Sequence, residues 1–170
     1  MKGQISFAEF LVSLLIFVGF TFYIYFQLIS FMPAYLFQIS SERMKIEAWQ
    51  ISELLVNDLG NPINWGDGSI GPAQIKRVGL SDQNFNKTNY VSLTKANRLD
   101  VLCRNDYSQV KNWIDIDRQF SFLLLDKNTG NVIIDCKPPS AYTPRINATM
   151  NRFVAFSTGT NIGELIVQVW

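Results

Sequence analysis

The hydrophobic and polar positions of this chain follow two unlike patterns, and the first is an unbroken apolar run. From Phe10 to Met32, 23 consecutive residues carry no charge, and 15 of them are leucine, isoleucine, phenylalanine or valine. As a helix, the run would be roughly 34 Å long, enough to cross a hydrocarbon core of about 30 Å. Its apolar side chains would favour insertion by about 5–9 kcal/mol in total. The run therefore predicts a membrane-spanning helix.

A cleaved secretory signal is the simplest alternative for an apolar segment this close to the N-terminus. Such a signal has an apolar region of about 7–15 residues that ends at a cleavage site of small residues. The run in this chain is longer, and residues 23–37 are mostly bulky. A helix that is retained in the membrane is therefore favoured over a conventional signal peptide.

Beyond Pro33 the apolar positions take a helical spacing, and polar residues occupy the other positions. The apolar residues recur at intervals of three or four: Met44, Ala48, Ile51, Leu55 and Leu59. Gly60 and Pro62 then provide a stop. This pattern predicts one long helix over residues 5–59, bent near Pro33. Its first half would lie in lipid, and its amphipathic second half would pack on the rest of the chain.

From Asn61 onward the pattern predicts a small α+β head. A short strand is expected over residues 74–80, and helical spacing predicts helices over Ser92–Arg104 and Tyr107–Trp113. Four strand-like runs follow as two hairpins, over residues 118–126, 131–136, 152–158 and 163–170. The polar, proline-containing stretch 137–151 is expected to be a surface loop. We therefore expect an antiparallel sheet with the long helix across one face.

Charge and composition narrow the classes of function. Lys2 and Glu9 are the two charged residues of positions 1–41, whereas the other 27 charged residues lie in 42–170. A net charge of +1 gives no field that would attract nucleic acid. The chain has no histidine and only two cysteines, which excludes histidine-based catalysis and four-thiolate metal sites. The composition therefore predicts no enzyme, no cofactor and no nucleic-acid partner.

The first residues, MKGQISFAEFL, place a short basic stub before a glutamine, a serine, an acidic residue and the apolar run. This arrangement resembles the class III signal of archaeal type IV pilin-like proteins. The resemblance implies that a membrane prepilin peptidase recognises Lys2 and Gly3 and cuts before Gln4. Glu9 is then the sixth mature residue, whereas the family usually has its glutamate at the fifth, so a cut after Gln4 is the alternative.

The resemblance also implies an organisation and a location. It divides the chain into a leader (1–3), a transmembrane and filament-core helix (4–41) and a pilin-like head (42–170). The N-terminus would be cytoplasmic and the head extracellular, first in a single-pass membrane protein and then in a cell-surface filament. Expected partners are the lipid bilayer, a membrane assembly platform, and identical or homologous pilin subunits. An unprocessed membrane-anchored protein with a ligand- or partner-binding head is the alternative.

Glu9 carries a charge next to the apolar run, which is costly at the edge of a hydrocarbon core unless the charge is paired. Lys2 is a candidate partner before cleavage. After cleavage, the free amino group of a neighbouring subunit could take its place and set the register of helix packing. The alternative is a solvated carboxylate in the headgroup region, where the helix dipole favours an acid in the first turn.

Two further pairs of residues are candidate modification sites. Cys103 and Cys136 would form a disulfide in an extracellular head, at a gain of about 2–4 kcal/mol; two free buried cysteines are the alternative. Asn86 and Asn147 each begin an Asn-x-Thr triplet in a polar stretch, and are therefore candidate N-glycosylation sites.

Two acidic motifs invite a chemical interpretation but favour a structural one. Asp115 and Asp117 would face the same way in a strand, as a catalytic carboxylate pair would, but a solvated turn explains them equally well. The loop from Asp126 to Asn131 has oxygen ligands suited to calcium but lacks the downstream glutamate of an EF-hand. A hairpin turn with Gly130 at positive φ is favoured there.

Overall fold

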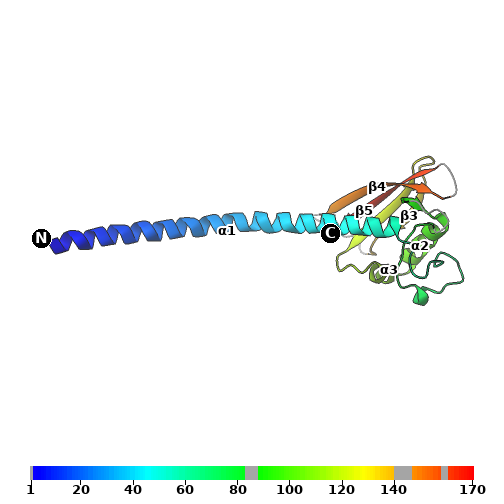
Figure 1. Ribbon diagram of the computed structural model, residues 1–170, viewed down its shortest axis with the longest axis horizontal. Helices are drawn as coiled ribbons and strands as arrows, with labels where there is room; N and C mark the ends of the chain where they lie inside the picture. Colours follow the sequence, from blue (N-terminus) through cyan, green and yellow to red (C-terminus); the bar gives the residue numbers. More distant parts are fainter. Residues whose placement is uncertain (1, 83–87, 140–146, 158–160) are drawn as a thin grey trace. The chain divides into compact units, whose positions relative to one another are not determined.

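The computed structural model describes residues 2–82, 88–139, 147–157 and 161–170, and for residues 2–6 it describes the backbone alone. Helix α1 (Lys2–Asn57) is continuous and keeps Pro33 inside it (Figure 1). The chain divides into two compact units, one formed by the residues up to Ser40 and the other by Ser41–Trp170. The second unit is called the head below. Helix α1 is shared by both units.

The end of α1 is fixed by the residues that follow it. The backbone N–H of Gly60 donates to Asp58 Oδ1 at 2.7 Å, and Gly60 has φ +78°, a left-handed conformation that favours glycine. A Cβ on Gly60 would lie 2.4 Å from Trp65 Nε1, so no larger residue fits here. The predicted helix of residues 5–59 is confirmed, with its start at Lys2 and its end two residues earlier, at Asn57.

The head is α+β, as predicted. Its helices are α2 (Leu93–Asn105) and α3 (Tyr107–Ile114), with a short 3-10 helix η1 (Pro72–Gln74) before them. Within the described residues, a sheet of five strands runs in the order β1-β4-β5-β2-β3 (Figure 1). Its strands are β1 (Tyr90–Val91), β2 (Phe120–Asp126), β3 (Val132–Cys136), β4 (Ala148–Phe156) and β5 (Ile162–Val169).

The sheet corrects the expectation of a purely antiparallel arrangement. The predicted hairpins β2–β3 and β4–β5 are present, and they are joined through antiparallel pairing of β2 with β5. However, β1 pairs in parallel with β4, so the sheet is mixed. Since β1 is only two residues long, it is too short to show the alternation by which a strand is predicted.

Two segments outside the hairpins also differ from prediction. Residues 74–80 do not form a strand, because the backbone there bonds to two different neighbours: Lys76 N donates to Asn61 O, and Leu80 N donates to Leu55 O. Strand β4 begins at Ala148, within the stretch expected to be a loop. The first residues of β4 show little alternation of apolar and polar side chains, and Thr149 and Asn151 are polar and exposed. The strand was therefore not predicted there.

The core of the head lies between α1 and one face of the sheet. The apolar stripe of the amphipathic second half of α1 is at most 3% exposed; it consists of Met44, Ala48, Ile51 and Leu55. They belong to one cluster with the inward residues of the central strands, which include Phe120, Phe122, Leu124, Leu165 and Val167. Ion pairs from Glu47 to Arg118 (3.1 Å) and from Glu53 to Arg152 (2.6 Å) fix α1 to the segments around β2 and β4.

Candidate functional site

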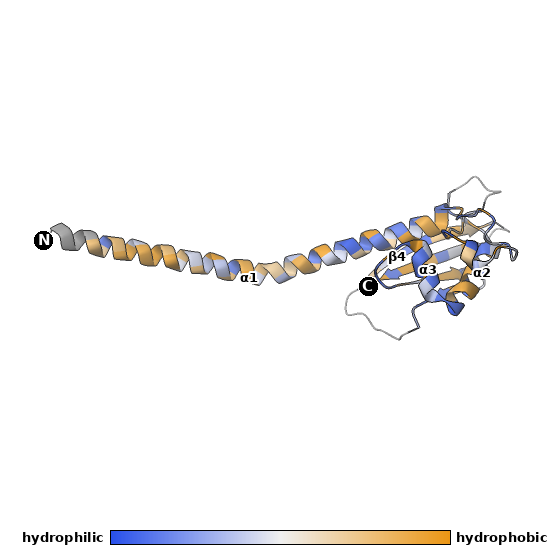
Figure 2. Cartoon of the chain, turned by 90° about the horizontal axis from the view of Figure 1, so that it is seen from below, coloured by the Kyte–Doolittle hydropathy of each residue, from blue (hydrophilic) through white to orange (hydrophobic). Residues whose placement is uncertain are grey.

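The apolar part of α1 is the largest exposed hydrophobic surface in the described residues. From Phe7 to Phe37 the large hydrophobic side chains are each 40–68% exposed. Figure 2 shows mostly apolar residues along this part of the helix, whereas the part in the head alternates between polar and apolar. A soluble monomer seldom exposes a contiguous apolar surface beyond a few hundred Å². This surface is therefore a candidate interaction site.

The polar side chains within this segment bond to the helix itself. Thr21 Oγ1 donates to Phe17 O at 2.8 Å, and Gln27 Nε2 donates to the Tyr23 hydroxyl at 3.1 Å. Such local bonds lower the cost of placing polar groups in an apolar medium. By length and composition, α1 is also the one helix in the described part of the chain that could cross a membrane.

The residues of the predicted cleavage site lie at the start of this surface. Lys2, Gly3 and Gln4 are in the first turn of α1, and their side chains lie outside the described residues. Glu9 is exposed on the same helix. The proposed pairing of Glu9 with Lys2 or with a neighbouring amino group therefore stays a prediction.

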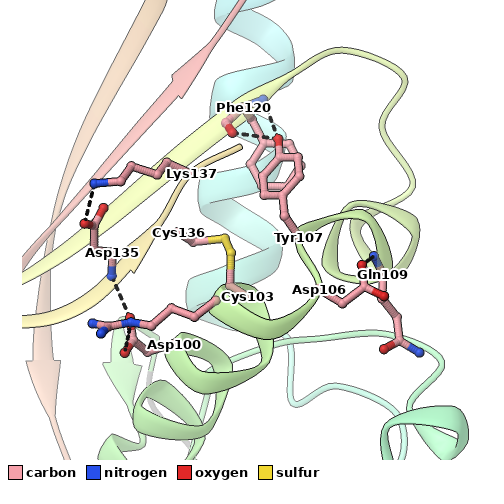
Figure 3. The surroundings of a disulfide bond; sticks show 10 residues. Asp100, Cys103, Asp106, Tyr107, Gln109, Phe120, Asp135, Cys136 and Lys137 are labelled. Atoms are coloured by element: carbon pink, nitrogen blue, oxygen red, sulfur yellow. Dashed lines mark hydrogen bonds and ion pairs between the residues drawn. A yellow bond between two sulfur atoms is a disulfide. The ribbon is translucent and has the colours of Figure 1, made fainter. Parts of the chain in front are cut away.

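The predicted disulfide is present in the head. Cys103 on α2 and Cys136 on β3 are bonded, with 5.6 Å between their Cα atoms, and both are buried (Figure 3). Beside the bond, Asp100 Oδ1 accepts from the backbone N–H of Asp135 at 2.9 Å. Arg104 pairs with the other oxygen of Asp100 at 2.9 Å. These contacts hold α2 against β3, an edge strand of the sheet.

Tyr107 fastens α3 to the sheet on the other side of the disulfide. Its hydroxyl donates to Phe120 O at 2.7 Å and accepts from Phe120 N at 3.1 Å (Figure 3). Burial raises the pKa of the Tyr107 phenol, and its hydrogen bond to the Phe120 backbone opposes that rise. The side chain therefore works as a neutral hydrogen-bonding group at the first residue of β2. Sequence analysis did not single it out.

A hollow of about 520 Å³ opens beside the disulfide, between the end of α2 and the end of β3. Its charged side chains already have partners inside the protein. Lys137 pairs with Asp135 at 2.8 Å, and Asp106 Oδ1 accepts from Gln109 N at 3.0 Å (Figure 3). These charged side chains are therefore engaged in contacts within the head.

The acidic motifs are structural. Asp115 is the left-handed C-cap of α3, with φ 60° and ψ 53°, and Asp117 is exposed in the bend that follows. They share no strand, because β2 begins only at Phe120. Asp126 Oδ1 accepts from Asn128 N at 2.8 Å in a hairpin turn, as favoured. Among the described residues, no group of three or more acidic or cysteine side chains could hold a metal ion.

The candidate glycosylation sites have different outcomes. Asn147 is exposed immediately before β4, and Thr149 of its triplet is exposed as well. Asn86 lies outside the described residues. The geometry at Asn147 is thus open to an enzyme, and modification itself stays a prediction.

Lys95 is a buried charge that sequence analysis also missed. It is 7% exposed, and its Nζ donates to Leu59 O and Ser81 O, each at 2.8 Å. Burial lowers the pKa of Lys95, while the nearby carboxylates of Asp82 and Asp58 oppose that change. The lysine joins α2 to Leu59 and Ser81, two positions in the long segment after α1. The available clue in the sequence was that Lys95 lies next to Ala96, which belongs to the apolar face of α2.

In comparisons with known proteins, no family model, no curated protein and no solved structure matches the chain.

Proposed function

We propose that the chain is a structural subunit, a major or minor pilin, of an archaeal type IV pilus-like surface filament. The observation that carries the proposal is the apolar surface of α1 from Phe7 to Phe37, on a helix that continues without interruption into the core of the head. A filament of this kind is built from such helices, packed side by side. The MKGQISFAEF beginning supplies the expected site for a prepilin peptidase.

The exposed surface needs a different cover at each stage of the proposed life cycle. In the bilayer, lipid chains would cover the segment, which is long enough to span it. In the filament, the same side chains would pack against neighbouring helices. A simple membrane anchor needs only the first of these stages.

Glu9 would then act in assembly. A carboxylate in the apolar core of a filament is costly unless it is paired. The amino group that cleavage creates on a neighbouring subunit is an oppositely charged partner. We therefore assign Glu9 to alignment of adjacent helices and Lys2, Gly3 and Gln4 to leader recognition.

The head has features that suit an extracellular location. A disulfide between Cys103 and Cys136 persists in oxidising compartments and is rare in the cytosol. Asn147 and Thr149 of the glycosylation triplet are exposed, as N-glycosylation requires. Both features fit an N-terminus in the cytoplasm and a head outside the cell.

The decisive experiment determines the mature N-terminus. The full chain is expressed in membranes with and without an archaeal prepilin peptidase, and its intact mass and N-terminal sequence are measured. We expect a terminus at Gln4, or at Ile5 for the alternative cut, only with the peptidase. A Gly3→Val variant should keep Met1 under both conditions, and Gly19→Val, distant from the site, should be cut normally.

Retention of Met1 in the unmodified chain beside an active peptidase, with a known pilin cut in the same membranes, contradicts the proposal. That result would favour the alternative, an unprocessed single-pass protein with a partner-binding head. Shearing and electron microscopy of cells that express the processed chain would then show whether it enters filaments.

A further inference from the structure

Two polar side chains lie within the apolar surface of α1, and their hydrogen-bonding groups are only partly used. Gln27 Nε2 donates to the Tyr23 hydroxyl oxygen at 3.1 Å. A glutamine amide has two N–H groups and a carbonyl oxygen, and a tyrosine hydroxyl both donates and accepts. The bond therefore leaves the Tyr23 hydroxyl proton, and Oε1 and the second N–H of Gln27, without a partner in the described part of the chain.

The position of Tyr23 and Gln27 along the helix makes these unused groups costly. A helix crosses a hydrocarbon core with about 20 residues. Every stretch of that length within the uncharged run from Phe10 to Met32 contains both residues. Lipid chains offer no hydrogen-bond donor or acceptor, and an unsatisfied polar group in an apolar medium is unfavourable. The two side chains therefore need a polar partner inside the membrane.

One side of α1 combines these polar groups with room for a close neighbour. Gly19, Tyr23 and Gln27 follow one another at intervals of four residues, which places them on one side of the helix. A Cβ added to Gly19 would meet no atom within 4 Å, so the chain itself leaves the space beside this glycine open. A glycine lets the backbone of a second helix approach closely. Gly19, Tyr23 and Gln27 are called the polar face below.

The opposite side of this part of α1 has different chemistry. Thr21 lies about 200° around the helix from Tyr23, and its hydroxyl already donates to Phe17 O at 2.8 Å. The residues around it line an apolar groove; they are Phe17, Val18, Phe22 and Tyr25. Tyr25 carries a hydroxyl on this side but has no amide one turn away, so it provides a matched control for Tyr23.

We propose that two copies of the chain pair in the bilayer through their polar faces, with their α1 helices parallel. Copies that insert in the same orientation place Tyr23 and Gln27 at the same depth. An amide carries a donor and an acceptor, so two Gln27 amides are complementary across a two-fold axis, each N–H donating to Oε1 of the other. A second copy is thus a partner that supplies both of the missing groups.

The pairing belongs to the membrane stage, before any filament forms, and it needs no cleavage. The inference rests on the proposed function only for the placement of α1 in the bilayer. Glu9 lies on the same side of α1, about five turns before Gln27 and outside the uncharged run. Water at the membrane edge would therefore screen the two Glu9 carboxylates of a pair from each other.

Energy transfer between labelled copies of the full, uncleaved chain in phosphatidylcholine vesicles tests the pairing. The dyes are attached to Val101→Cys, which is 56% exposed on α2 before substitution, because both native cysteines are bonded. We expect dimers whose amount rises with the protein-to-lipid ratio. Gln27→Leu should weaken association about three- to twenty-fold, as loss of interhelical hydrogen bonds does, and Tyr23→Phe by less. Tyr25→Phe should leave it unchanged.

Oxidative crosslinking in the same vesicles tests which side of α1 makes the contact. Ile16 lies one turn before Gly19 on the side of the polar face, whereas Leu14 lies on the opposite side. Ile16→Cys should form dimers readily, and Leu14→Cys should stay mostly monomeric. All these positions lie outside the compact unit of the head, so its fold should be unaffected.

Three results would each overturn the inference: an unmodified chain that stays monomeric at every ratio, a Gln27→Leu variant that associates as tightly as the unmodified chain, and equal weakening by Tyr23→Phe and Tyr25→Phe. Equal crosslinking of Ile16→Cys and Leu14→Cys would overturn it as well. The proposed function would still stand after any of these results if the peptidase cuts the chain. A chain that pairs but is never cut would contradict the proposed function and leave the pairing intact.

Discussion

The two parts of α1 have the same secondary structure and opposite surroundings. Up to Phe37, large apolar side chains cover every side of the helix and are exposed, whereas from Met44 onward a stripe of apolar residues is buried in the head and only Ile46 and Trp49 are exposed large apolar residues. A single stripe matches a single sheet face, and the chain provides that face itself. A helix that is apolar all round needs cover from outside the chain. The second part of α1 thus serves the folding of the head, and the first part is the surface that the proposed assembly would use.

Replacing one leucine by alanine in each part of α1 tests this difference with the largest expected effect. Leu55→Ala removes a fully buried side chain and should lower the free energy of unfolding of the head by about 2–5 kcal/mol. Leu15→Ala alters a side chain that is 65% exposed and should change head stability by no more than about 0.5 kcal/mol. Denaturant unfolding of the full chain in detergent, followed by near-UV circular dichroism, measures both. Equal losses would mean that the first part of α1 also belongs to the head's core.

Reduction of the disulfide should weaken the head alone. Cys103→Ser/Cys136→Ser should cost about 2–4 kcal/mol, because the bond restricts the unfolded chain. The helicity of the apolar part of α1 should be unchanged, since no cysteine lies there. Far-UV and near-UV circular dichroism of the same sample separate the two effects. A simultaneous loss of both would show that the two parts unfold together.

Lys95→Met tests the contact that secures the loop after α1. The variant leaves Leu59 O and Ser81 O without their hydrogen-bond donor, at a cost of about 1–3 kcal/mol. Lys76→Met, at an exposed lysine, is the control and should be nearly neutral. Amide hydrogen exchange should also speed up around residues 59–81 in Lys95→Met. Unchanged exchange there would argue against this role.

The smallest expected effect concerns pH and the ion pair at the end of α1. Hydrogen bonds from Arg152 and then Asn57 lower the pKa of Glu53 below its usual 4.5. The stabilisation is therefore fully present above pH 4.5 and is lost as the pH falls through the lowered pKa. Glu53→Gln should flatten this part of the stability profile of the head, and Asp117→Asn, at an exposed carboxylate, should not. An identical acid profile for Glu53→Gln and the unmodified chain would exclude the contribution.

Sequence analysis predicted most of the fold because its elements have strong periodicity. The apolar run, the stripe of α1 and the two hairpins each repeat a local pattern over several turns or strand residues. The parallel pairing of Tyr90–Val91 and the early start of β4 depend on contacts between distant segments, which leave little local pattern. The same reason explains why Lys95 and Tyr107 were missed. Both side chains bond to backbone groups of residues distant in sequence, which leave no pattern of side chains to read.

The candidate sites divide in a similar way. The disulfide was predictable because a chain with two cysteines allows one pairing. The exposure of Ile46 and Phe153 was not predictable, because both residues resemble ordinary core residues in the sequence. Only the register of the sheet and the buried side of α1 show that these side chains face outward.

The continuity of α1 has a mechanical consequence. Since the helix enters the core of the head directly, tension along its first part acts on a buried element and not on a surface linker. To release the head, a pulling force would have to slide Met44, Ala48, Ile51 and Leu55 past the sheet together and break the ion pairs at Glu47 and Glu53. Loading many contacts at once resists rupture better than peeling them one after another. Tension on the first part of α1 would therefore load the buried core of the head.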